Sequence, residues 1–222
     1  MLASIRCCTV LLFVTVSTAA VAQMSYQPAA PRTLLRVDSI EHGSYINDED
    51  IAMMKKHGTY LVPTAYLYVW YSQYGNLPSL YKQKMIDTAA VARANHKHAI
   101  QSGVKVALGT DSAVYPHGLN AHELDVYVNQ YGMTPLAAIQ STTLNAVDLM
   151  GWSAKTGSLD PGKWADIIAV QGDPLADIKI LQQISFVMKA GIIYKNLAQP
   201  GVVDHLVATT IPVEPAADQR AF

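Results

Sequence analysis

Two short polar segments carry side chains that can do metal or acid–base chemistry. His42 lies in Ser-Ile-Glu-His-Gly at 39–43, and Asp111 closes Gly-Thr-Asp at 109–111. Each residue comes directly after an apolar run typical of a strand. Since the carboxyl ends of parallel strands meet at one open face, an imidazole and a carboxylate at these positions can share a rim. The spacing alone equally allows a structural histidine and an aspartate that caps the next helix.

A second pair of histidines, His96 and His98, has the His-x-His form of a chelating pair. The pair lies inside a helical pattern that covers residues 79–102. Residues two apart on a helix point about 160° away from each other. We therefore predict that His96 faces the apolar side of this helix, that His98 faces solvent, and that the pair binds no metal.

Strand-like and helical patterns alternate before residue 151. The strand-like runs cover 36–43, 59–69 and 104–111, and the helical patterns cover 47–58, 79–102, 122–130 and 135–150. Asn47 before three acidic residues marks a helix start, Gly58 marks its end, and Thr134 caps a helix that begins with proline. Pro63 ends the second strand early. This order predicts an α/β fold with a parallel sheet.

The sequence pattern changes after Gly151. Short strand-like runs within 157–178 and 184–196 are separated by Pro-Gly and Gly-Asp-Pro turns. They predict a small β element outside the parallel sheet. Residues 197–222 form no clear pattern, so we expect an irregular tail.

The amino terminus has the pattern of an export signal. Arg6 precedes an apolar run at 7–22 that ends in Ala-Val-Ala, which predicts a signal peptide of residues 1–22. The alternative is a membrane anchor, but the run is shorter than the roughly 20 residues of a spanning helix. Cys7 and Cys8 both lie in this segment, so the mature chain has no disulfide. Residues 23–36 predict a linker.

The composition of the chain restricts the classes of molecule that it can bind. Of 222 residues only 15% are charged, and the formal net charge is −1. This composition indicates one globular domain, with or without a small appendage, and offers no electrostatic basis for nucleic-acid binding. We expect no membrane association after signal cleavage, and a periplasmic or secreted protein.

Three segments, at 37–64, 103–118 and 133–178, together resemble the carboxyl-terminal half of metal-dependent amidohydrolases. The similarity is to the imidazolonepropionase-like and Xaa-Pro dipeptidase-like branch and runs from 37 to 196. It implies a TIM-like (β/α)8 barrel with one or two divalent metals, usually zinc, and a small β-sandwich built from both chain termini. Residues 37–152 then form about three βα units of the barrel, and 153–196 form part of the sandwich.

The resemblance also implies roles for individual residues. His42 matches the metal-binding histidine of the sixth strand. Asp111 matches the eighth-strand aspartate, which binds metal and takes a proton from the attacking water. His117, on the loop after that strand, is the candidate substrate-binding residue. The implied reaction is hydrolysis of a C–N bond in a small amide or dipeptide by metal-activated water.

Other ligands of the family lie upstream of the position that His42 occupies. They are a His-x-His pair, a bridging lysine and a fifth-strand histidine. Here no histidine precedes His42 and no lysine precedes Lys55. Zinc takes about four donors including water, so two are too few. We expect either a truncated hydrolase that needs its amino-terminal half in trans, or an inactive remnant that acts as a binding or assembly module.

Three strands cannot close an eight-stranded barrel. Val104, Val106 and Leu108 share one strand face, so we expect this apolar row to be exposed unless the linker or a second copy covers it. Exposed apolar sheet edges favour association. The sequence therefore predicts a homo-oligomer or an aggregation-prone chain.

The export signal makes a direct prediction. The mature protein should begin at Gln23 and be recovered from the periplasm or the medium, because signal peptidase cleaves after small residues such as Ala22. Amino-terminal sequencing of the recovered protein checks this. A mature chain that still carries Met1 would contradict it.

Overall fold

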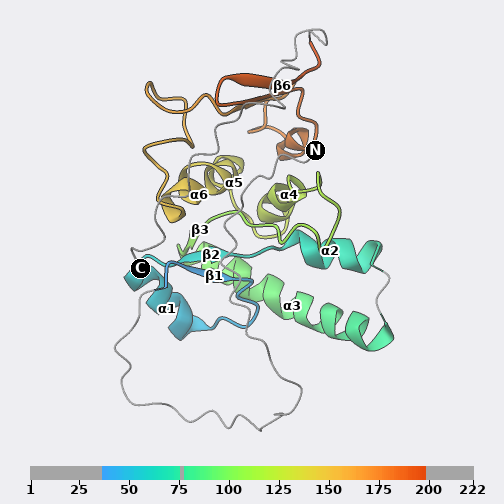
Figure 1. Cartoon of the computed structure of the whole chain (residues 1–222). Coiled ribbons are helices and arrows are strands. Elements are labelled where there is room, and N and C mark those ends of the chain that lie inside the picture. The colour runs from blue at the N-terminus through green and yellow to red at the C-terminus, as the bar shows by residue number, and fades with distance from the viewer. Residues whose placement is uncertain (1–36, 76–77, 199–222) are drawn as a thin grey trace, which may run out of the picture. The chain divides into compact units, whose positions relative to one another are not determined.

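Three short parallel strands form the sheet that carries both polar segments. They are β1 (Ser39–Glu41), β2 (Tyr60–Val62) and β3 (Lys105–Val106), and they pair in the order β1-β2-β3 (Figure 1). The computed structural model describes residues 37–75 and 78–198. Both pairings are parallel, so the predicted α/β fold with a parallel sheet is confirmed.

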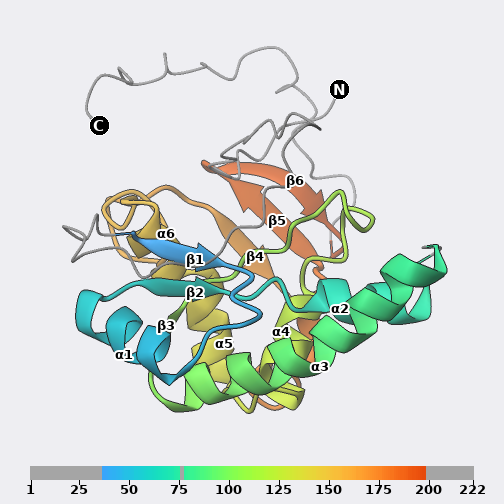
Figure 2. The same ribbon diagram turned by 90° about the horizontal axis from the view of Figure 1, so that it is seen from below.

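Helices connect and follow these strands. They are α1 (Asp48–His57), α2 (Tyr66–Gln73), α3 (Ser79–Gln101), α4 (His122–Asn129), α5 (Pro135–Thr142) and α6 (Leu144–Leu149). Figure 2 shows α1 and α3 on the same side of β1 and β2. The strands are therefore covered on this side by the helices that connect them.

The first helix has the ends that its sequence predicts. The Asn47 side chain accepts hydrogen bonds from the backbone N–H groups of Glu49 and Asp50, and Asp50 accepts one from the Asn47 N–H. This reciprocal capping box satisfies N–H groups that have no partner within the helix. Gly58 ends the helix with a φ of 72°, which glycine adopts without strain.

Apolar residues on the face covered by α1 and α3 form one of the buried clusters of the core. Ile40 and Leu61 pack with Ile51 and Met54 of α1 and with Ala99 of α3. The side chains lose contact with water there, which is the main favourable contribution to folding.

The predicted exposure of the apolar row on β3 is wrong. Val104 is 5% exposed and Val106 is 4% exposed, and Leu108 packs against a buried cluster. Val104 lies in the core with α1 and α3, while Val106 contacts a cluster that includes Ala138 of α5. The row faces the chain's own helices, so its burial needs no second copy.

The segment 59–69 is predicted as a strand run that Pro63 ends early; the early end is confirmed, but the residues from Tyr66 onward form the start of α2 and not strand. The strand ends at Val62, and the turn at Pro63 and Thr64 leads directly into the helix. No side chain at the start of α2 caps it. Glu123 of α4 does so, because its carboxylate accepts the backbone N–H groups of Ala65 and Tyr66 at 2.9 and 2.8 Å.

The pattern at 135–150 predicts one helix, but the structure has a break at Thr143. The hydroxyls of Ser141, Thr142 and Thr143 donate to carbonyls three or four residues earlier. Such hydroxyls compete with the helical backbone bonds and bend helices. The Ser141 carbonyl instead accepts the N–H of Leu108, at 2.9 Å. This bond ties the helix break to the residues after β3.

A second, antiparallel sheet follows, as the turn-rich sequence predicts. It has the order β4-β5-β6, with β4 at Ile167–Ala169, β5 at Phe186–Lys189 and β6 at Ile192–Asn196. A 3₁₀ helix, η1 (Ile178–Gln182), precedes β5 and contacts α4. The predicted signal peptide, the linker and most of the tail lie outside the described residues.

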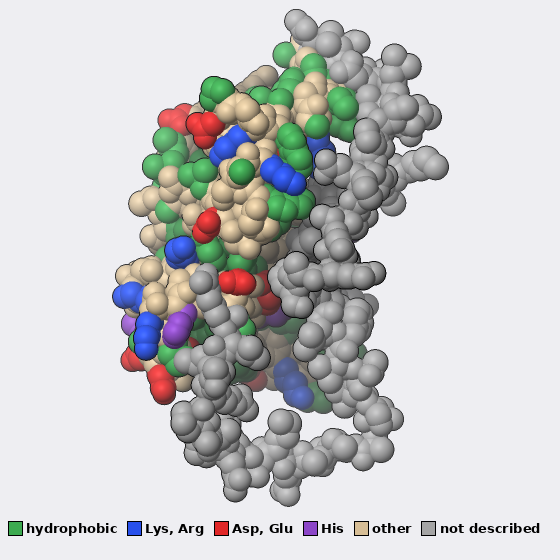
Figure 3. Space-filling model, turned by 60° about the vertical axis from the view of Figure 1, so that its left-hand side comes forward, with side chains coloured by type: hydrophobic (Ala, Val, Ile, Leu, Met, Phe, Trp, Pro, Cys, Tyr) green, Lys and Arg blue, Asp and Glu red, His purple; other side chains and the backbone are tan. Residues whose placement is uncertain are grey.

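Acidic and basic side chains are mixed on the face of the molecule shown in Figure 3. Neither sign forms a continuous patch on that face. Among the residues that the structure describes, no helix is both long enough and apolar enough to span a bilayer.

The buried cap on α2 predicts a pH dependence of stability. Glu123 is fully buried, and burial raises its pKa from 4.5 to about 8 although the two N–H bonds oppose this shift. The titratable side chains that interact with it electrostatically, Tyr115, Tyr127 and Tyr131, stay neutral because burial raises their pKa values. A carboxyl with a raised pKa binds more protons when folded. The contribution of this proton binding to the stability of the folded state is complete below pH 4.5 and is lost as pH rises towards 8.

Because Glu123 titrates, we expect the free energy of unfolding to fall by roughly 3 kcal/mol between pH 4.5 and 7. Urea unfolding across that range measures it. Glu123→Gln should flatten the slope, because the variant cannot titrate, whereas the exposed control Glu49→Gln should keep it. An unchanged slope in Glu123→Gln would contradict the assignment.

Candidate active site

Left-handed backbone occurs at residues other than glycine one residue after β1, two residues after β2 and five residues after β3. The φ angles are 63° at His42, 49° at Thr64 and 51° at Asp111. This conformation is uncommon for such residues, and it is a marked outlier for the β-branched Thr64. Each instance costs roughly 1–3 kcal/mol, and such strain concentrates at functional sites. The strand ends therefore mark the candidate site.

The conformation of His42 is held by its backbone. The Gly43 N–H donates to the Glu41 carbonyl at 2.8 Å, which closes a three-residue turn with His42 at its centre. A γ-turn with positive φ at this position is the rare, strained form. The His42 N–H donates to the Val62 carbonyl at 2.9 Å, and this bond joins the turn to the end of β2.

A buried histidine also fastens this turn. The ring of His96 is fully buried, and its Nε2 donates to the His42 carbonyl at 2.5 Å. Because a carbonyl only accepts, Nε2 carries the proton, and Nδ1 accepts from the Tyr131 hydroxyl at 3.0 Å. Burial lowers the pKa of His96 to about 4, so the ring is neutral.

The divergence of His96 and His98 is confirmed. His98 lies on the exposed side of α3 and contacts Asp48 at 2.7 Å. His96 faces inward, where both of its ring nitrogens are used in hydrogen bonds.

Thr64 determines which nitrogen of His42 is available. The Thr64 hydroxyl donates its one hydrogen to the Pro63 carbonyl and lies 2.6 Å from Nδ1 of His42. It must therefore accept from Nδ1–H, which leaves the lone pair on Nε2. In the described part of the chain no hydrogen-bond partner is found for this nitrogen. The second partner of an imidazole commonly sets its tautomer in this way at metal and acid–base sites.

Asp111 lies exposed just beyond β3. The alternative role as a helix cap is wrong, because the next helix starts at His122, far along the chain. His42 and Asp111 follow β1 and β3, which flank β2. The two residues therefore follow the two outer strands of this three-stranded sheet.

Two further residues belong to this rim, and the sequence interpretation missed both. Glu41 lies on the face of the sheet opposite α1 and α3, where it accepts from the Ser39 hydroxyl at 2.7 Å. Gly109 passes so close to β2 that an added Cβ would lie 2.4 Å from Val62 Cγ1 and 3.9 Å from Glu41 Oε2. Glycine is favoured here because the chain that follows β3 passes so close to the Val62 side chain of β2.

His117, the predicted substrate-binding residue, lies exposed on the loop between β3 and α4. No contact joins it to His42 or Asp111 in the described residues. The structure therefore places it on the loop that follows Asp111 without bringing it into the rim, and its role stays a prediction.

The described residues do not by themselves form a zinc site. Within residues 37–75 and 78–198, no group of three or more histidine, cysteine, aspartate or glutamate side chains is arranged to hold a metal. Catalytic zinc takes three protein ligands and a water. His42 and Asp111 supply donors of the right chemistry, but two donors are too few to complete the shell.

Residues 34–195 match the amidohydrolase family, and the chain belongs to that family. It is 37% identical over 172 residues to ochratoxinase from Aspergillus niger, covering 74% of this chain and 34% of that protein. It is 31% identical over 121 residues to adenine deaminase from Clostridium botulinum, covering 51% of this chain and 19% of that protein.

Solved structures of other proteins support the same family assignment. A Xaa-Pro dipeptidase superposes with a TM-score of 0.67 and 36% identity, over 72% of this chain and 40% of that chain. The crystal structure of A. niger ochratoxinase gives 0.63 and 36%, over 72% and 37%. The chain thus spans well under half the length of these relatives. Its parallel βα units correspond to part of the TIM-like barrel of the family.

The tautomer of His42 makes the second structural prediction. Replacing Thr64 with valine keeps the shape of the side chain but removes the acceptor for Nδ1–H, so the ring should populate both neutral tautomers. Thr64→Ser, which keeps the hydroxyl, should retain the wild-type tautomer. The ¹⁵N shifts of the His42 ring, measured at a pH where the imidazole is neutral, distinguish these states. Identical shifts in the valine variant would contradict the assignment.

Proposed function

We propose that this chain is part of a hydrolase that cleaves C–N bonds in small amides or dipeptides. The observation that carries the proposal is the strained rim on an amidohydrolase scaffold, with the His42 and Asp111 side chains exposed beyond the ends of β1 and β3 of the same parallel sheet. Family membership and the likeness to a Xaa-Pro dipeptidase and to ochratoxinase support the reaction type.

The roles of the rim residues follow from their chemistry. Asp111 is the proposed base, which accepts a proton from the attacking water and passes it to the leaving nitrogen. His42 presents the unprotonated Nε2 as an electron-pair donor. Thr64 and His96 hold its ring and its carbonyl, so the donor is preorganised. A bound divalent metal, which we propose to be zinc, would supply polarisation of the substrate carbonyl.

Further ligands are needed for this chemistry. We propose that they come from barrel strands outside the described residues, either elsewhere in a longer protein or from a second chain. A second candidate function, a catalytically inactive binding or assembly module, is favoured by one observation. The described residues contain no complete metal-holding group. We further propose an exported protein whose partner is a small molecule.

Complementation tests the proposal. The chain is co-expressed with a His-x-His-containing amino-terminal part of a related amidohydrolase, and hydrolysis is measured on a panel of dipeptides and small amides. We expect the chain alone to hold less than one equivalent of metal, because binding energy depends on a complete ligand set. Activity should appear on complementation.

Variants separate the two candidate functions. In the complemented enzyme, Asp111→Asn should lower kcat/KM by about 10²–10⁴-fold, since it removes the base. The exposed control Asp173→Asn, which lies outside the rim, should leave it unchanged. Complemented protein that folds and binds metal but hydrolyses nothing would favour the inactive module. Stoichiometric metal held by the chain alone and lost in His42→Ala would overturn the partial-site assignment.

A further inference from the structure

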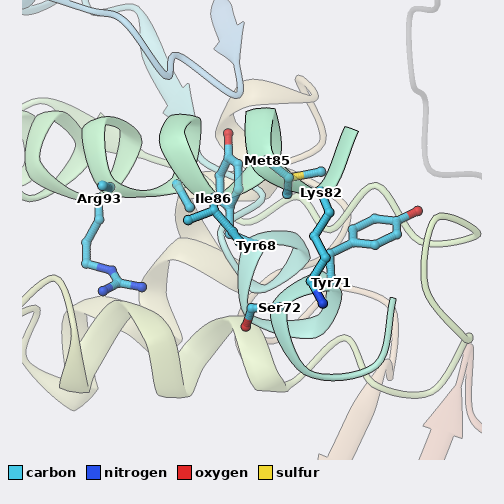
Figure 4. A pocket seen from close by; sticks show the side chains of 9 residues that line it. Tyr68, Tyr71, Ser72, Lys82, Met85, Ile86 and Arg93 are labelled. Carbon is cyan, nitrogen blue, oxygen red and sulfur yellow. The ribbon is translucent and has the colours of Figure 1, made fainter. Parts of the chain in front are cut away.

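A pocket between α2 and α3 lies apart from the strand ends. Its volume is about 250 Å³. Its lining residues are Tyr68, Tyr71 and Ser72 from α2, and Lys82, Met85, Ile86, Ala89, Ala90 and Arg93 from α3 (Figure 4). Helix α3 contributes one side of the pocket, and α2 closes the other.

The wall of the pocket is mostly apolar. Met85, Ile86 and the two alanines form a strip along α3, since residues three and four apart share a helix face. The ring of Tyr68 faces this strip in Figure 4. Small-molecule sites typically have such an apolar wall with a few polar groups that orient the ligand.

Two cationic side chains, Lys82 and Arg93, lie at the two ends of the apolar strip on α3. Lys82 and Arg93 are eleven residues apart on α3, about three turns or roughly 16 Å. Figure 4 shows both side chains on the α2 side of the helix, with the apolar strip between them. Neither forms an ion pair with any other described residue. The pocket therefore has unbalanced positive charge at both ends of an apolar wall.

We propose that this pocket binds a small amphipathic carboxylate, with a compact aromatic or aliphatic body on the apolar strip and its carboxylate at one of the two cations. An inorganic anion would leave the strip in contact with water, and a neutral apolar molecule would make no ionic contact with either cation. The volume restricts the ligand to a small molecule. The site does not rest on the proposed hydrolase function.

The pocket has one physical link to the rim. The Tyr68 hydroxyl hydrogen-bonds the Ser44 hydroxyl at 2.8 Å, and Ser44 is two residues after His42. Asn95 of α3 donates to the Ser44 carbonyl at 2.9 Å. A ligand that moves the Tyr68 ring therefore acts on the segment that follows His42.

The binding experiment uses the full chain with ¹³C-methyl methionine. The probe is 3-phenylpropionate, the neutral comparison is 3-phenylpropanamide, and the anion comparison is inorganic phosphate. We expect the carboxylate to shift the Met85 methyl resonance with a Kd on the order of 1 mM, as for a ligand of this size. The amide and phosphate should bind at least about fivefold more weakly. Equal binding of the amide would overturn the proposal.

Variants identify which cation contacts the carboxylate of the ligand. One of the two variants Arg93→Gln and Lys82→Gln, the one that removes the cation in contact with the carboxylate, should weaken binding by about fivefold, in the range of an exposed ion pair. The matched control Lys97→Gln, on the same helix but outside the pocket, should not. Ala89→Leu should abolish binding by filling the space, while the unfolding midpoint confirms that each variant folds. Full binding by Ala89→Leu, or equal affinity in all three charge variants, would overturn the proposal.

Discussion

The hydrogen bond from the buried ring of His96 to the His42 carbonyl supports the geometry of the whole rim. His42 adopts a strained left-handed backbone, and such strain persists only where the surroundings over-determine it. His96 can donate because burial keeps it neutral with the proton on Nε2. The same ring receives the Tyr131 hydroxyl, so the rim is tied to the tyrosine-rich core behind it.

The three strand ends are supported by different parts of the chain. Thr64 orients the His42 ring, and the backbone that follows Thr64 is itself held by Glu123. Gly109 allows the chain that follows β3 to approach β2 before it reaches Asp111. His42 is thus positioned by residues far away in sequence, whereas Asp111 follows directly from the close approach at Gly109. This arrangement preorganises a site, although its complete chemistry needs groups beyond the described residues.

Much of the fold was predictable because its signals are local. The Asn47 cap, the Gly58 stop and the proline at the start of α5 each act within one turn of helix, so the sequence marks those boundaries. Helical periodicity likewise separated His96 from His98. The predictions from sequence were wrong where groups distant in sequence determine the local structure. Glu123 starts α2 within a predicted strand run, and helices bury the row that contains Val106.

The sequence by itself determined the family, the order of the βα units, and His42 and Asp111 as candidate site residues, because these depend on residue types and short-range patterns. The tertiary structure decided the tautomer of His42, the inward role of His96, and the parts played by Thr64, Glu41 and Gly109. These depend on hydrogen bonds and close contacts between residues distant in sequence. Donor and acceptor assignments require knowing which groups meet, and only the folded chain brings them together.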